Sequence, residues 1–212
     1  MVSIIRLVCF VVIVATYSLT AYAHPVAYAD SAMLESYNTP DMSENNFIYS
    51  PQFWWSVGVQ NFHLGGSGVG ENALYPRVAF LKRWNYTNWQ VNLYAWSGIG
   101  WARQGSNDDL SLLGGGQFDA ESRRWYFASQ IQTLQHHSLK DVWMSRSGIG
   151  VAPYLAKSGE LQGFLIVQAF YNSFDPHPWI VGPMIRLFYK SIFVEVGSGY
   201  KGEWLINFMT SF

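Results

Sequence analysis

Short segments of alternating polarity recur through almost the whole chain, and they constrain its fold more than any other feature. From about residue 30 onward, apolar side chains occupy every second position of segments that Gly, Asn, Asp, Pro and Ser separate. A period of two residues is typical of β-strands that have two different faces. Beyond the N-terminal segment, no run approaches the roughly 18 unbroken apolar residues of a membrane helix. The pattern therefore predicts an all-β protein.

We expect about twelve strands, with ten as the alternative count. They cover residues 31–38, 46–50, 53–63, 74–84, 89–101, 110–120, 123–135, 142–155, 161–171, 179–189, 192–199 and 203–212. The links between them alternate in length. Longer links at 39–45, 65–73, 102–109, 136–141 and 172–178 alternate with shorter ones at 51–52, 85–88, 121–122, 157–160 and 190–191. This alternation predicts longer loops at one end of the sheet and tight turns at the other.

The composition favours a membrane barrel over a soluble lipocalin-like barrel or a sandwich. Half of the residues are hydrophobic, 17% are aromatic and 13% are charged, whereas soluble domains carry roughly 25% charged residues. Each strand of a transmembrane β-barrel presents only every second residue to lipid, so its hydrophobicity is high but spread evenly. The net charge of −1 gives no indication of nucleic-acid binding.

The N-terminus has the features of a cleaved signal peptide. Arg6 precedes much of an apolar run over residues 4–15, and Ala21-Tyr22-Ala23 is a cleavage site of the small-x-small type. We expect residues 1–23 to be removed and residues 24–212 to form one barrel domain. An uncleaved anchor helix is the alternative, but the apolar run is short for a membrane span. The single cysteine, Cys9, lies within the signal.

The C-terminal segment resembles the last strand of bacterial outer-membrane β-barrels. Trp204, Ile206, Phe208 and Phe212 alternate with polar or smaller residues, and Thr210 departs from the usual aromatic or aliphatic residue. The resemblance implies a closed antiparallel transmembrane β-barrel in the cell outer membrane, with short periplasmic turns and longer extracellular loops. It also implies that Phe212 is an assembly signal for the barrel-assembly machinery and that outer-membrane lipid surrounds the barrel. The oligomeric state is left open.

Charged residues on the mixed face of the strands are the candidate functional groups. A buried charge costs several kcal/mol unless it is paired, so we expect an inward polar network. A two-residue turn at 121–122 would place Asp119 opposite Arg124, and a turn at 190–191 would place Arg186 opposite Glu195. The network is interpreted as a structural salt-bridge network or as a charged constriction that selects small solutes. Its members are Arg77, Asp119, Arg124, Arg146, Arg186 and Glu195.

The sequence therefore predicts a narrow, non-enzymatic pore or a structural barrel, without a cofactor. Two alternatives stay open. A lipid-modifying hydrolase would need a nucleophile near a histidine, for which Ser67 and Ser138 are the candidates beside His63 and His137. A metal-binding accessory barrel linked to metal efflux would use histidines of the expected outer loops, although no short ligand spacing is present. These weak metal candidates are His63, His136, His137 and His177.

Overall fold

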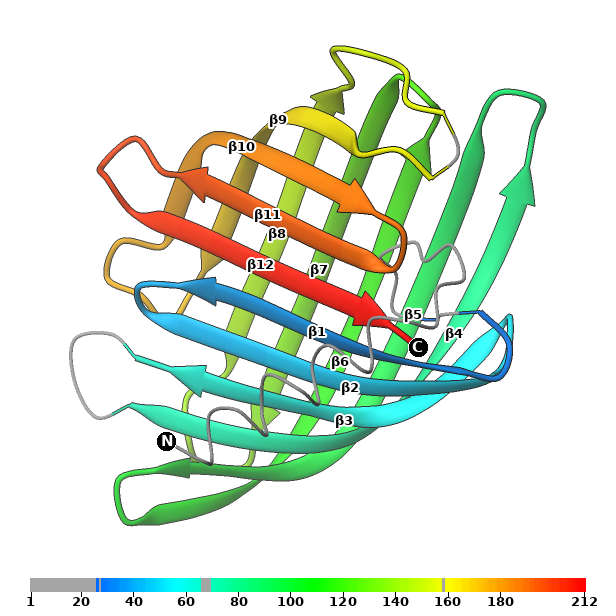
Figure 1. The fold of residues 1–212 in the computed structure, drawn as a ribbon. Helices are drawn as coiled ribbons and strands as arrows, with labels where there is room; N and C mark the ends of the chain where they lie inside the picture. The colour runs from blue at the N-terminus through cyan, green and yellow to red at the C-terminus, as the bar shows by residue number, and fades with distance from the viewer. Residues whose placement is uncertain (1–25, 27, 66–69, 158) are drawn as a thin grey trace, which may run out of the picture.

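The structure is a computed structural model that describes residues 26, 28–65, 70–157 and 159–212, and these residues form a closed β-barrel (Figure 1). In this part of the chain, twelve antiparallel strands pair with their sequence neighbours, and β1 pairs with β12. The all-β class and the count of twelve are confirmed. The predicted signal peptide lies outside the described residues. The strands are β1 (Ser31–Thr39), β2 (Met42–Gln52), β3 (Trp55–Leu64), β4 (Glu71–Asn85), β5 (Gln90–Gln104), β6 (Asn107–Glu121), β7 (Trp125–His136), β8 (Val142–Val151), β9 (Gln162–Asn172), β10 (Trp179–Tyr189), β11 (Ile192–Ser198) and β12 (Trp204–Ser211).

The even number of strands places the start of β1 and the end of β12 at the same end of the barrel. We call this the terminal end and the opposite one the distal end. At the terminal end, Ala32 and Phe212 exchange two backbone hydrogen bonds of 2.8 and 2.9 Å. These bonds continue the β1–β12 ladder and close the sheet, so the barrel has no free strand edge there.

Three links differ in length from the expectation. Thr39 pairs with Met42, and Gln104 pairs with Asn107, so the expected loops 39–45 and 102–109 are two-residue turns at the distal end. The expected short turn 157–160 belongs to a longer link, 152–161, at the terminal end. The expectation of longer distal loops and shorter terminal turns is therefore wrong for these links. The strands extend into these polar segments, because the hydrogen bonds of the ladder join backbone groups and do not depend on the side chains.

The two faces of each strand differ as the alternation predicts. On β12, Trp204, Ile206 and Phe208 are exposed, whereas Leu205 and Asn207 are buried. The same alternation on the other strands gives the barrel an apolar outer surface. Exposed aromatic side chains occur towards both ends of the strands, among them Trp84, Trp101, Trp125, Trp143, Trp179 and Tyr189. Such girdles mark the interfacial regions of a membrane. No helix among the described residues is long and apolar enough to span a bilayer.

A cluster of four polar side chains lies on the outer face near the distal end of β1 and β2. The Ser36 hydroxyl donates to Asn45, the Asn45 amide donates to Ser43, the Ser43 hydroxyl donates to Asn38, and the Asn38 amide donates to Ser36, at 2.8 to 3.0 Å. The four side chains thus form a closed cycle of hydrogen bonds. Each satisfies its neighbour, which lowers the cost of placing polar groups on an apolar surface.

Candidate functional site in the barrel lumen

The distal part of the lumen is filled by apolar side chains. Residues at or near the distal ends of six strands are buried and belong to one apolar cluster, and Leu139 and Phe174 of the distal links pack against it. The distal members of this cluster include Met42, Leu64, Ala102, Leu134, Val142 and Leu205. These side chains form a packed apolar layer at the distal end of the lumen, beside the buried contact of Glu71 with His136.

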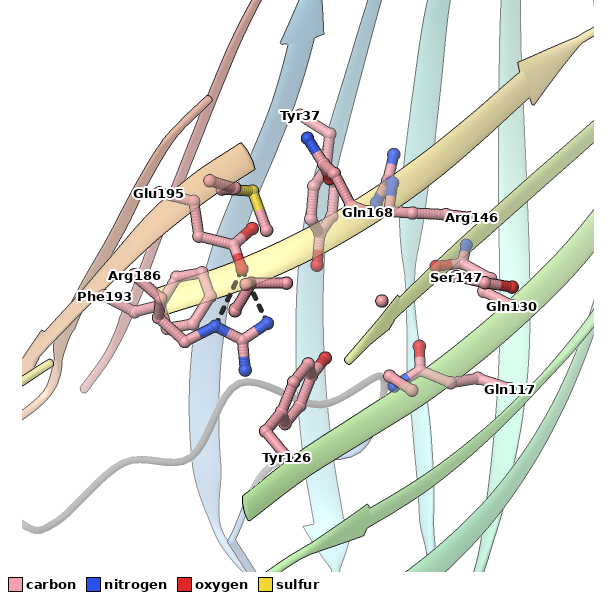
Figure 2. Close-up of a pocket in the computed structure, with 14 residues that line it drawn as sticks. Tyr37, Gln117, Tyr126, Gln130, Arg146, Ser147, Gln168, Arg186, Phe193 and Glu195 are labelled. Atoms are coloured by element: carbon pink, nitrogen blue, oxygen red, sulfur yellow. Dashed lines mark hydrogen bonds and ion pairs between the residues drawn. The ribbon is translucent and has the colours of Figure 1, made fainter. Parts of the chain in front are cut away.

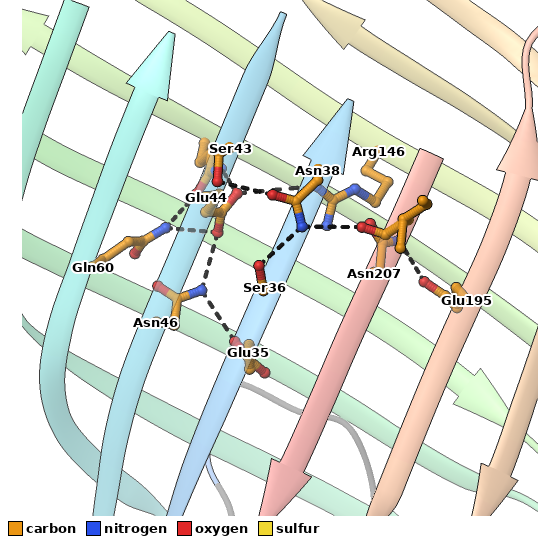
Figure 3. Close-up of polar contacts among 12 residues, drawn as sticks. Glu35, Ser36, Asn38, Ser43, Glu44, Asn46, Gln60, Arg146, Glu195 and Asn207 are labelled. Carbon is orange, nitrogen blue, oxygen red and sulfur yellow. Dashed lines mark hydrogen bonds and ion pairs between the residues drawn. The ribbon is translucent and has the colours of Figure 1, made fainter. Parts of the chain in front are cut away.

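A polar bridge crosses the lumen below this apolar layer. The Gln132 amide on β7 donates to the Glu44 carboxylate on β2 at 2.9 Å and accepts from Gln60 on β3 at 3.2 Å. Gln60 and Asn46 also donate to Glu44, at 2.8 and 3.1 Å (Figure 3). Because β7 is not a sheet neighbour of β2 or β3, these bonds join opposite walls. We call Glu44, Gln60 and Gln132 the cross-lumen bridge.

Two arginines flank the bridge. The Arg77 Nη1 donates to Gln60 at 2.8 Å, and Arg77 is 7% exposed. The Arg146 Nη2 lies 3.9 Å from Glu44, and its guanidinium stacks over the Tyr37 ring at 4.1 Å from the ring centroid. Arginine over an aromatic ring gains a cation–π attraction that grows when water is excluded. Both arginine side chains lie on the inner side of the barrel wall.

Arg186 and Glu195 occupy directly opposed positions on β10 and β11, as the expected turn requires. The Arg186 Nε donates to Glu195 Oε1 at 2.7 Å, and the Arg186 Nη2 lies 2.6 Å from the same oxygen. Asn207 donates to the other carboxylate oxygen at 2.6 Å, and Arg186 stacks on the Tyr126 ring at 3.8 Å from its centroid. Both ends of the ion pair are thus held by additional contacts, as a buried pair requires.

The expected pairing of Asp119 with Arg124 is wrong. Glu121 and Tyr126 are the first paired residues of β6 and β7, so four residues lie between them where two were expected, and Asp119 pairs with Ala128. The Ser122 hydroxyl accepts the backbone N–H of Trp125 at 2.8 Å, which stabilises this wider turn. Arg124 therefore lies in the exposed turn. The Asp119 carboxylate instead accepts hydrogen bonds from Asn92 and Gln117, at 2.6 and 3.1 Å.

Several inward polar residues were not expected from the sequence. Glu44 and Glu71 lie in segments that were interpreted as loops, whereas the structure places them on β2 and β4, each 1% exposed. The sequence around Glu44 does contain a signal that could have identified it. Met42, Glu44, Asn46 and Ile48 share one parity, so extending the strand upstream would have placed Glu44 in the lumen. Glu35, Asn46 and Gln132 are further buried polar residues outside the expected network, although they lie in segments that were predicted as strands.

The four histidines do not come together. His136 alone enters the barrel, where its Nε2 lies 3.1 Å from the Glu71 carboxylate and its Nδ1 lies 3.0 Å from the Lys140 carbonyl. His63, His137 and His177 are exposed, and His63 contacts Asn72 on the outer face. Among the described residues, no group of three or more His, Cys, Asp or Glu side chains is placed to hold a metal ion.

The described contacts do not place a serine hydroxyl beside a histidine, as the hydrolase alternative requires. Ser138 is exposed, and its backbone N–H donates to Asp109 at 2.6 Å. The described contacts of His136 and His63 involve Glu71, the Lys140 carbonyl and Asn72, and none involves a serine hydroxyl. Ser67, the other nucleophile candidate, lies outside the described residues.

The lumen is hollow towards the terminal end. A cavity of about 1,320 Å³ is lined there by the strand ends and links, with Tyr126, Phe164 and Phe188 on its wall. We call it the vestibule. A smaller polar cavity of about 50 Å³ lies deeper, and we call it the chamber. The two cavities share four lining residues, which form a neck between them: Gln117, Tyr126, Arg186 and Phe193.

Comparison with known proteins finds similar folds but no related family. No protein-family model matches the chain, and no curated protein matches it. Among solved structures, the KdgM porin in complex with disordered oligogalacturonate has a similar fold, with 9% identity and a TM-score of 0.48. The match covers 86% of this chain and 99% of the porin chain. A second KdgM porin structure gives 10% identity over the same shares and a TM-score of 0.46. Pseudomonas aeruginosa OccK8 (OprE) covers 81% of this chain and 57% of its own, at 8% identity and a TM-score of 0.42.

Similarity at this level carries no function from those porins to this chain. The chain's own residues show a closed antiparallel barrel with an apolar outer surface and aromatic side chains towards both ends. That arrangement is the architecture of outer-membrane β-barrels.

Proposed function

We propose that the chain is an outer-membrane barrel that acts as a narrow, non-enzymatic pore and is closed in the conformation described above. Its terminal end faces the periplasm and its distal end faces outward, as the even strand count and the class require. The vestibule is then the periplasmic entrance. Passage of a solute requires both the cross-lumen bridge and the apolar layer to move.

The cross-lumen bridge is the observation that carries this proposal. A purely structural barrel can fill its lumen with apolar side chains, which cost nothing to bury. Here the bridge spans opposite walls with neutral amides and one carboxylate, and each contact is a single hydrogen bond. Such bonds contribute about 1 kcal/mol each between neutral groups and about 1.5–3 kcal/mol each to a carboxylate, so opening the bridge would cost a few kcal/mol. We therefore favour a pore over a structural role.

Planar-bilayer conductance of the refolded protein tests the proposal. The wild type should show no steady open level. Gln132→Ala combined with Leu134→Ala changes two inward positions of β7, one in the bridge and one in the apolar layer. This variant should show discrete open levels.

Ile131→Ala combined with Gln135→Ala is the matched control, because both residues are exposed on the outer face of the same strand. This control should stay closed. A steady large conductance in the wild type would show that the lumen is not occluded. A silent inward variant that still migrates as a folded barrel would show that the chain is a structural barrel instead.

A further inference from the structure

The chamber at mid-depth carries polar groups that the contacts above leave unused. Gln168 on β9 is 3% exposed, and neither its amide nitrogen nor its amide oxygen has a hydrogen-bond partner among the described residues. Burying an amide without a partner costs roughly 1–3 kcal/mol on the scale of protein mutations. Figure 2 shows Gln168 beside Tyr37 and Arg146 in the chamber wall. An unpartnered amide in a polar cavity indicates a position for a bound molecule.

Gly148 on β8 contributes room for such a molecule. It pairs with Gln168 and lines the chamber without a side chain of its own. The chamber's volume of about 50 Å³ holds roughly three to five water-sized atoms, since a single water needs about 10–15 Å³ on this scale.

Arg146 supplies unused hydrogen-bond donors to the same space. A guanidinium carries five N–H donors. The described contacts of Arg146 are the 3.9 Å approach to Glu44 and two aromatic stacks, over Tyr37 and Phe170. A separation of 3.9 Å is too long for a hydrogen bond. The planar donor fork of arginine matches a carboxylate or another planar oxyanion in a bidentate arrangement.

The acidic groups near the chamber already have hydrogen-bond donors. Glu195 is paired with Arg186 through one oxygen and accepts from Asn207 through the other. Glu44 accepts hydrogen bonds from the amides of Asn46, Gln60 and Gln132 and keeps its charge, 3.9 Å from Arg146. The Gln168 amide and the guanidinium of Arg146 are therefore the groups of the chamber that a bound molecule would engage.

We propose that the chamber binds a small carboxylate, or an oxyanion of the same size, between Arg146 and Gln168. The anion's oxygens accept from the Arg146 guanidinium and from the Gln168 amide nitrogen. A carboxylic acid with a longer body places its carboxylate in the chamber and its body in the vestibule, past Tyr126 and Arg186. Access is from the terminal end, so binding does not require the lumen to conduct.

Calorimetric titration of the refolded barrel with sodium acetate at constant ionic strength tests this inference, with sodium chloride as the reference titrant. Acetate should bind saturably at one site. Arg146→Met and Gln168→Leu should each weaken acetate binding at least about tenfold, which corresponds to about 1.4 kcal/mol. Arg103→Met is the matched control, because Arg103 is an exposed arginine in the distal hairpin of β5 and β6. This variant should bind as the wild type does.

Gln168→Leu keeps the inference testable if Arg146→Met does not fold, because it removes no charge. Heats that are identical for acetate and chloride in the wild type would overturn the inference. So would acetate binding that both chamber variants retain within about twofold, a difference of only about 0.4 kcal/mol. The bilayer currents described above report on conduction alone, so a failure of the pore proposal and a failure of the anion site give different results.

Discussion

The distal and terminal ends of the lumen are built by the same alternating strands, yet one is filled and the other is hollow. At the distal end the inward positions carry aliphatic residues such as Leu64, Leu134 and Leu205, and they pack into one cluster. At the terminal end they carry polar and aromatic residues around a cavity of about 1,320 Å³. Alternation fixes which residues point inward, but the size and polarity of those residues decide whether the lumen closes. The predictions below test that distinction.

The ion pair at the neck should show the largest effect on stability. Glu195→Leu leaves Arg186 buried without its carboxylate, and Arg186→Met leaves Glu195 without its cation. Removing one partner of a buried pair costs about 3–5 kcal/mol, because an uncompensated charge remains. The double variant should lose much less than the sum of the two. A double-mutant cycle read by denaturant unfolding measures the coupling energy, and strictly additive losses would show that the two side chains do not interact.

The two ends of β12 offer a matched pair of aromatic residues. Phe212 and Trp204 are both 45% exposed. Replacing either by alanine should cost at most about 2 kcal/mol of barrel stability from lost apolar contact. Only Phe212→Ala should also reduce the amount of assembled barrel in the outer membrane, because we propose that Phe212 is read by the assembly machinery. Equal surface levels of the two variants, measured by heat-modifiable gel migration of outer-membrane fractions, would remove that role.

Cysteine labelling should distinguish the hollow end from the filled end. The only cysteine of the sequence is Cys9, within the predicted signal peptide, so a mature barrel carries no competing thiol. Phe188→Cys lies on the vestibule wall, and Leu64→Cys lies in the distal apolar layer. A maleimide should react with Phe188→Cys at least about tenfold faster, since a buried thiol reacts only during local opening. Equal rates would show that the distal end is open as well.

The sequence allowed the wall of the barrel to be predicted much better than its contents. Strict alternation identified the inward face of β10, β11 and β12, and a two-residue turn gave the Arg186–Glu195 register. The β6–β7 turn is wider than expected: β7 begins at Trp125, so Arg124 precedes the strand and lies in the turn although it has the inward parity of β7. Turn length was therefore the weakest step of the sequence-based argument.

The cross-lumen contacts could not be predicted in this way. Glu44 and Gln132 are 88 residues apart in the sequence, and their strands are not paired. Whether they meet depends on the tilt and stagger of all the strands, which jointly set the barrel's width. Local patterns describe pairs of neighbouring strands and contain no information about opposite walls. The unpartnered Gln168 belongs to the same class of feature.

The distal mouth should also respond to pH, although this is the smallest effect. Asp41, in the turn between β1 and β2, contacts Asp175 in the link between β9 and β10, and these elements lie on different sides of the mouth. Burial raises the pKa of Asp41 above its usual range, and the hydrogen bond with Asp175 and the charge of Asp175 raise it further. The folded state therefore binds a proton more readily than the unfolded chain does.

The sign of the pH effect follows from that difference. Burial and the neighbouring Asp175 disfavour the ionised form of Asp41, which penalises the folded state at a pH above the raised pKa of Asp41. As the pH falls through the raised pKa towards the ordinary aspartate range near about 4, the shared proton relieves this penalty and the folded state gains stability relative to the unfolded one. Asp41→Asn should flatten this dependence and should stabilise the barrel at pH 7. Asp175→Asn should act in the same direction, because it removes the same pair. The free energy of unfolding in urea, measured at neutral and mildly acidic pH, makes the comparison. Parallel pH profiles for the wild type and both variants would mean that these two carboxyl groups do not interact across the distal mouth.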